Sequence, residues 1–169
     1  MSNRITFEQL IETIGSLPYG SIFKIEGCCE AGKSTLADEL ARVTITGVVH
    51  VDQYLLDPEG VAESVQYADR VDYRALEAAI VKARSNANGM IIEGICLHLV
   101  LSRLNLGFDE AVYVKRISSA GIWHDGMHIE DFSRGKVKLP REPDLSDMRY
   151  HITHTPHLVI EHSYLRVET

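Results

Sequence analysis

Long apolar runs, cysteine and basic side chains are all scarce in this chain, and each shortage excludes a class of protein. No run of about 18 apolar residues is present, so we expect no membrane-spanning helix. Three cysteines, two of them adjacent, are too few for a disulfide framework. Lysine and arginine number 17 against 24 acidic residues, and a formal net charge of −7 argues against a nucleic-acid backbone as the main partner. We therefore expect a soluble, cytoplasmic protein with no nucleic-acid or membrane partner.

The chain does have enough apolar surface for a core. Its 169 residues are 45% hydrophobic, which suits one compact domain with little material left for a second. No long linker, internal repeat or low-complexity segment interrupts it. We expect residues 1–169 to form a single domain.

The most specific motif is G-x-x-x-x-G-K-[ST] at residues 27–34. An apolar run at 21–25 precedes it and an amphipathic stretch at 35–43 follows it, which is the setting that a phosphate-binding loop requires. In such a loop the backbone N–H groups and the helix N-terminus face phosphate oxygens, Lys33 reaches the outer phosphates, and the Ser34 hydroxyl is placed for Mg²⁺. The residues expected to bind the nucleotide are Gly27, Cys28, Cys29, Glu30, Ala31, Gly32, Lys33, Ser34 and Thr35.

Short apolar segments alternate with amphipathic ones along the rest of the chain. Thr6 and Gln9 fit a capping box that opens a helix ending at Gly15, and Asp72 can cap a later helix. A further helix is expected at 97–104. The expected strands are 21–26, 47–51, 90–92, 111–114 and 158–160. This alternation predicts an α/β domain whose mainly parallel sheet has helices on both faces.

Acidic residues come at the ends of two expected strands. Asp52 follows the strand at 47–51, and Glu93 follows the one at 90–92. Ligands of open α/β sheets bind at the carboxyl ends of strands, so both carboxylates should point toward the bound phosphates. There they can hold Mg²⁺ or take the proton of an acceptor hydroxyl. The alternatives are a helix N-cap for Asp52 and a turn carboxylate before Gly94 for Glu93.

The segment from about 116 to 142 departs from the alternating pattern, because it mixes glycine, histidine and charged residues without an apolar period. It is either a solvated surface excursion or a mobile lid that closes cations over a transferring phosphate. Its basic residues are Arg116, Arg134, Lys136, Lys138 and Arg141.

With these residues in hand, the chain resembles the uridine kinase-like group of P-loop small-molecule kinases, which includes nicotinamide riboside kinase, pantothenate kinase and phosphoribulokinase. The resemblance spans nearly the whole chain in order. It is carried by the leading helix, the loop at 27–34, the acidic-aromatic segment at 50–54, Ile91-Ile92-Glu93-Gly94, and Tyr150-His151 followed by Pro156 and an apolar strand.

The resemblance implies a three-layer fold whose five-stranded parallel sheet has the order 2-3-1-4-5, with a small lid. It also implies that Asp52 is the base for the acceptor hydroxyl and that Ser34, Asp52 and Glu93 surround Mg²⁺. The residues implied to contact the acceptor are Asp52, Tyr54, Asp69, Tyr73 and Glu93.

Two departures from the group's pattern bear on activity. These kinases usually open the lid with a cluster of arginines, whereas here Arg116 is followed by Ile-Ser-Ser-Ala-Gly. Arg116 and Arg134 are therefore the candidate catalytic cations beside Lys33 and Asp52. The segment between Asp52 and Glu93 is also short, which leaves less chain for a nucleoside pocket and argues against uridine as the acceptor.

The sequence favours an enzyme that uses ATP and Mg²⁺ to phosphorylate a hydroxyl of a small metabolite. The alternatives are a nucleotide-dependent hydrolase or switch, and an ATP-binding protein that has lost its lid and transfers little.

Eight histidines raise the question of a transition-metal site, with His124 and His128 four residues apart and His151, His154 and His157 at three-residue spacing. Pro156 interrupts the second set and no fourth ligand is evident, so we expect no dedicated site of this kind.

Overall fold

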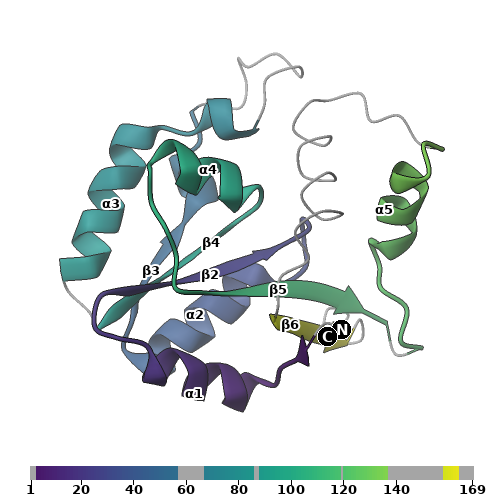
Figure 1. The fold of residues 1–169 in the computed structure, drawn as a ribbon, viewed down its shortest axis with the longest axis horizontal. Coiled ribbons are helices and arrows are strands. Elements are labelled where there is room, and N and C mark those ends of the chain that lie inside the picture. The colour runs from purple at the N-terminus through teal and green to yellow at the C-terminus, as the bar shows by residue number, and fades with distance from the viewer. Residues whose placement is uncertain (1–2, 57–66, 86–87, 119, 137–157, 164–169) are drawn as a thin grey trace.

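The computed structural model describes residues 3–56, 67–85, 88–118, 120–136 and 158–163 (Figure 1). The strands are β1 (Asn3–Arg4), β2 (Ser21–Gly27), β3 (Gly47–His50), β4 (Gly89–Gly94), β5 (Glu110–Ile117) and β6 (Leu158–Ser163). The α-helices are α1 (Phe7–Ser16), α2 (Lys33–Thr44), α3 (Tyr73–Ser85), α4 (Leu97–Arg103) and α5 (Gly126–Ser133). Two 3₁₀ helices, Val51–Tyr54 and Tyr67–Arg70, lie between β3 and α3.

The described strands form one sheet in the order β1-β6-β5-β2-β4-β3, and every strand pair is parallel. The expected α/β class with a parallel sheet is confirmed, but the expected number of five strands is wrong. The sheet has six, because the two-residue strand β1 pairs with β6 and adds an edge to the expected order. So short a strand has no period for sequence reasoning to detect.

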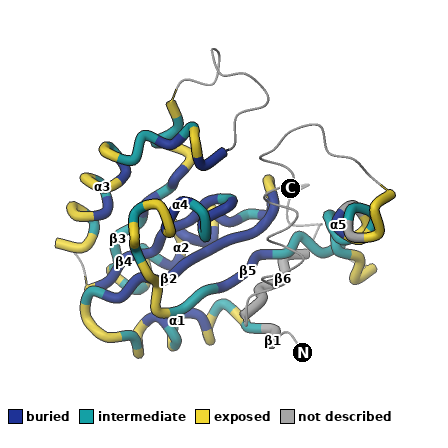
Figure 2. The backbone as a smooth tube through the Cα atoms, turned by 45° about the horizontal axis from the view of Figure 1, so that its top comes forward, coloured by how far each residue is buried: buried dark blue, intermediate teal, exposed yellow. Residues whose placement is uncertain are grey.

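Helices cover both faces of the sheet (Figure 2). On one face, α1 and α2 bury Leu10 and Leu40 against Phe23 and Ile91 of the sheet. On the other face, α3 and α4 pack against residues such as Ile22 and Met90, which alternate with the first set along β2 and β4. Both central strands are buried throughout, as expected for strands covered on two sides.

Capping residues start two of the helices as the sequence predicts. Thr6 and Gln9 form a reciprocal capping box on α1, which ends one residue later than expected, at Ser16. Asp72 accepts a hydrogen bond of 3.0 Å from the backbone N–H of Ala75 at the start of α3. These local signals needed no tertiary information.

The segment expected as an irregular lid is more regular than its composition suggested. Arg116 and Ile117 continue β5, and Gly126–Ser133 forms the helix α5. Ile117 and Trp123 form an isolated antiparallel bridge, which folds the intervening turn back on the end of β5. The expected lid residues Lys138 and Arg141 lie outside the described residues, as do Tyr150, His151 and Pro156. None of the described helices is long and apolar enough to cross a membrane.

Gly27, at the end of β2, allows the phosphate loop to pass close to β5. A Cβ atom at this position would lie 2.5 Å from the backbone oxygen of Val114. We predict that Gly27→Ala lowers the free energy of unfolding by about 1–3 kcal/mol, because the backbone of β5 cannot yield cheaply. The matched control is Gly15→Ala in α1, where a Cβ meets nothing within 4 Å. This control should gain about 0.5–1 kcal/mol. Urea denaturation followed by circular dichroism measures both, and equal stability of the two variants would contradict the prediction.

Candidate functional site

The loop after β2 has the backbone of a phosphate cradle. Glu30 and Gly32 both adopt positive φ, 60° and 91°, and Gly32 leads directly into α2. Lys33 is buried at 7% exposure, and its Nζ donates a hydrogen bond of 2.8 Å to the backbone oxygen of Cys28. An ammonium group has three protons to donate, so this contact holds Lys33 against the loop while leaving donors for a phosphate.

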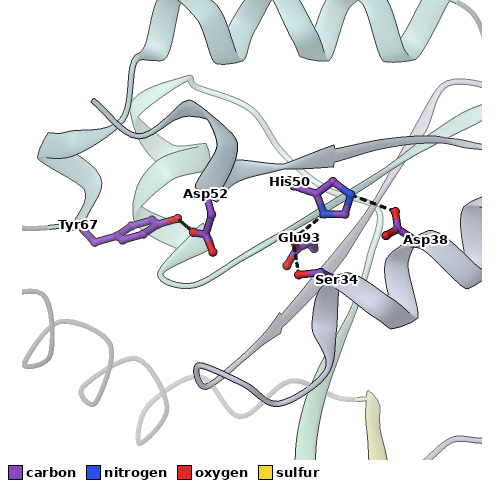
Figure 3. Close-up of polar contacts among 6 residues, drawn as sticks. All are labelled: Ser34, Asp38, His50, Asp52, Tyr67 and Glu93. Carbon is purple, nitrogen blue, oxygen red and sulfur yellow. Dashed lines mark hydrogen bonds and ion pairs between the residues drawn. The ribbon is translucent and has the colours of Figure 1, made fainter. Parts of the chain in front are cut away.

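Four side chains meet beside the loop, where α2 faces β3 and β4 (Figure 3). Ser34 donates a hydrogen bond of 3.0 Å from Oγ to Oε1 of Glu93. His50 Nδ1 lies 2.7 Å from the same Glu93 oxygen, and His50 Nε2 lies 3.0 Å from Oδ1 of Asp38. The ring satisfies both carboxylates when both its nitrogens carry protons, because an ionised carboxylate only accepts hydrogen bonds.

Secondary structure explains why these four residues meet. Ser34 and Asp38 are four residues apart in α2 and so lie one turn apart on the same face of the helix. His50 and Glu93 are direct register partners in the parallel pair β3 and β4. Register partners send their side chains to the same face of a sheet, and here that face meets α2.

Glu93 is the carboxylate that the loop engages. It is 1% exposed, and although its Oε1 has two partners, its Oε2 has no hydrogen-bond partner among the described residues. A buried carboxylate oxygen without a partner is costly, and a nearby cation would stabilise it. The oxygens of Ser34 and Glu93 are the hard ligands that Mg²⁺ takes while keeping several waters, so these residues fit that ion. Glu93 lies within β4, which extends beyond the expected strand.

Asp52 lies in the same neighbourhood but has a different partner (Figure 3). The strand β3 ends at His50, one residue earlier than expected, and Asp52 belongs to the exposed part of the following 3₁₀ helix. Its Oδ1 accepts a short hydrogen bond from the hydroxyl of Tyr67. Burial, followed by this hydrogen bond and the charge of Asp52, raises the pKa of Tyr67 far above its usual value. Tyr67 therefore remains a donor that fixes one oxygen of Asp52 and leaves the other for a ligand.

Two of the residues expected to contact the acceptor, Asp69 and Tyr73, share a neighbour in α4. Arg103 forms an ion pair with Asp69, and its guanidinium lies 5.9 Å from the centre of the Tyr73 ring. The Tyr73 hydroxyl donates to the backbone oxygen of Ala68 at 2.7 Å. The structure thus brings Asp69 and Tyr73 together, in a cluster that joins α3 to α4.

Tyr54, also expected at the acceptor, lies elsewhere. It lines a hollow of about 520 Å³ together with residues of α2, β3 and α3. Ile45, Val48 and Ala83 are also among the lining residues. No loop residue lines this hollow. The expected contact between Tyr54 and an acceptor stays a prediction that this position does not support.

Of the two candidate lid cations, Arg116 is the one beside the loop. Its Nη1 lies 3.5 Å from the carboxylate of the loop residue Glu30, and its side chain is 11% exposed. Arg134 follows α5 and pairs with Glu130 on that helix, with more than half of its side chain exposed. The structure therefore brings Arg116, and not Arg134, to the loop residues it describes.

The turn that follows β5 is connected to the loop through aromatic residues. The Cys28 thiol lies 3.3 Å from the hydroxyl of Tyr113, whose ring meets Trp123 edge-on with centroids 6.2 Å apart. Lys115 places its ammonium 4.4 Å from the centre of the Trp123 ring. The turn after β5 is thus linked to the loop through Tyr113 of β5.

Sequence reasoning missed three residues that the site uses. His50 and Asp38 hold Glu93, and Tyr67 holds Asp52. Only His50 carried a signal, because it ends a strand just before the acidic motif.

Among the described residues, no three histidine, cysteine or acidic side chains are grouped so that they could hold a metal ion. His124 precedes α5, which begins at Gly126, so the two residues of the His124/His128 spacing do not lie on one helix.

Alkaline stability provides a test of the contact between Tyr67 and Asp52. Above about pH 10, the usual tyrosine pKa, the unfolded chain loses the Tyr67 proton while the folded chain keeps it. The contribution of the protonated Tyr67 to the free energy of unfolding is fully present below this pH and is lost as the pH rises above it. We predict that Tyr67→Phe reduces this loss by about 1 kcal/mol per pH unit above pH 10.

The measurement is urea denaturation between pH 9 and pH 11. Tyr19→Phe is the matched control, because Tyr19 is 76% exposed. If the free energy of unfolding falls with pH as steeply in both variants as in the wild type, Tyr67 does not hold its proton as described.

Comparison with known proteins supports the fold. No protein-family model matches the chain, and no curated protein matches it. A solved structure from Silicibacter sp. TM1040, described as a "putative fructose transport system kinase", matches with a TM-score of 0.52 at 14% identity, over 92% of this chain and 98% of that one. A "possible uridine kinase" from Bacillus stearothermophilus matches with a TM-score of 0.48 at 20% identity, over 63% of this chain and 78% of that one. At these identities the likeness concerns architecture, and the chain has the α/β fold of the Silicibacter structure along nearly its whole length.

Proposed function

We propose that this protein is an ATP-dependent kinase that transfers the γ-phosphoryl group to a hydroxyl of a small molecule. The observation that carries the proposal is the contact between the loop residue Ser34 and the buried carboxylate of Glu93. It joins the loop that carries the phosphate-binding motif to a buried carboxylate on the adjacent strand, and this arrangement suits the metal and phosphate contacts that phosphoryl transfer needs. The shared fold with a kinase-named structure supports the same conclusion.

The loop residues would bind and orient the triphosphate. Backbone N–H groups around Gly32 and the N-terminus of α2 would face the phosphates, and Lys33 would offer its remaining donors to the outer ones. Ser34 and Glu93 would hold Mg²⁺, which would supply positive charge to offset the charge that develops on the phosphates. Arg116, held beside the loop by Glu30, is the cation best placed to add positive charge on the lid side.

Asp52 would orient the acceptor and receive its proton. It stands on the turn after β3, next to the strand that carries Glu93. Tyr67 occupies one carboxylate oxygen, so the other can accept from a hydroxyl in line with the γ-phosphorus. Because the transition state is loose, this base contributes mainly by positioning its partner.

The role of Asp52 can be tested by changing its charge alone. We predict that Asp52→Asn lowers kcat at least about 100-fold while ATP affinity changes less than about threefold, because the amide cannot take a proton. ADP formation and calorimetric ATP binding measure the two effects. Glu77→Gln, an exposed carboxylate on α3, is the matched control and should keep wild-type kinetics. Full activity in Asp52→Asn would remove the proposed base.

Lys33→Ala should act on the nucleotide itself. Its loss removes the ammonium that faces the outer phosphates, and we predict at least about tenfold weaker ATP binding together with loss of transfer. Calorimetry with ATP and with AMP checks this. Weakened binding of AMP, which lacks outer phosphates, would point to a misfolded loop rather than to a lost phosphate contact.

The acceptor is identified by Mg²⁺-dependent ADP formation across a panel of nucleosides, vitamin precursors and sugars. Turnover that depends on one class and vanishes in Asp52→Asn supports a kinase for that class. ADP release that ignores every acceptor would indicate a hydrolase, and ATP binding without turnover would indicate a binding protein.

A further inference from the structure

His50 lies at the candidate site but has no role in the proposed chemistry. It ends β3, its side chain is 15% exposed, and it lies between two carboxylates from different elements. Glu93 is on the neighbouring strand, and Asp38 is on the helix that begins at the loop. The ring therefore ties the first turns of α2 to the carboxyl end of β4.

The contacts of His50 determine how Glu93 is presented. Ser34 and His50 both meet Oε1, at 3.0 Å and 2.7 Å, which fixes the rotation of the carboxylate about its last bond. Oε2 is left buried and without a hydrogen-bond partner among the described residues. Without His50, the carboxylate could rotate and exchange its two oxygens with only the Ser34 hydroxyl to oppose it.

Asp38 in turn holds the ring of His50. Its Oδ1 lies 3.0 Å from Nε2, on the side of the ring opposite Glu93. Asp38 is 62% exposed, so it touches solvent, whereas Glu93, the other carboxylate that meets His50, is enclosed. A histidine that binds one group while a carboxylate holds its other nitrogen is fixed in ring orientation.

We infer that His50, anchored by Asp38, is a positioning residue that fixes Glu93 so that its Oε2 is presented to the Mg²⁺ of the bound nucleotide. The inference rests on the proposed function only for the identity of that ion. It assigns no chemical step to His50, which acts through Glu93.

Two substitutions at His50 separate its two contacts. The amide nitrogen of asparagine lies near the position of ring Nδ1 and can still donate to Glu93, whereas that of glutamine lies near Nε2 and reaches Asp38 instead. Each variant keeps one contact and loses one. A purely structural role would make them alike, and a role in holding Glu93 makes them differ.

The measurement is calorimetric binding of ADP, once with Mg²⁺ and once with EDTA, so it needs no acceptor and no turnover. We expect His50→Gln to lose about tenfold or more of the gain in ADP affinity that Mg²⁺ provides, and His50→Asn to stay within about threefold of wild type. Affinity in EDTA should be unchanged in both. Glu39→Gln, the exposed neighbour of Asp38 on α2, is the matched control.

Equal Mg²⁺ gains in the two His50 variants, whether both kept or both lost, would overturn the inference. If neither variant folds by circular dichroism, Asp38→Ala decides, since it removes the oxygen that meets His50 Nε2 and its exposed side chain can be changed with little risk to the core. A fall of about threefold in the gain in ADP affinity that Mg²⁺ provides supports the inference, and no fall overturns it.

A wild-type protein that binds ADP more tightly with Mg²⁺ but phosphorylates no acceptor would reject the proposed function and leave this inference standing.

Discussion

The parallel pairing of β4 with both β2 and β3 is the constraint on which the site depends. Its register sets Glu93 beside Ile25 on one side and beside His50 on the other. Because β2 runs directly into the loop and β3 into the turn of Asp52, one register places the buried carboxylate of Glu93 between the loop and the candidate base. A slip of one residue would send Glu93 to the opposite face of the sheet, away from Ser34.

Much of this arrangement could be predicted from sequence because its signals are local. The loop motif has fixed residue types at fixed spacing, the helix caps involve residues three apart, and the buried strands are short apolar runs. Glu93 was identified because strand ends and ligands coincide in α/β sheets. Its contact with Ser34 then follows from the fold alone.

The parts that sequence could not predict depend on contacts between distant segments. Tyr67 follows Asp52 by 15 positions and meets it only through the path of the intervening chain. His50 and Asp38 are 12 apart, on a strand and a helix whose separation no periodicity encodes. The strand β1 was missed because its two residues carry no pattern, and α5 because its eight residues mix polar and apolar side chains without a sustained apolar period.

The aromatic contacts behind the loop have an optical consequence. Trp123 is the only tryptophan in the sequence, and it meets Tyr113, whose hydroxyl touches the thiol of Cys28 in the loop. Indole emission responds to small changes in the polarity and packing around the ring. The protein thus carries its own fluorophore two contacts from the phosphate cradle, so that loop rearrangements can be followed in real time without any attached label.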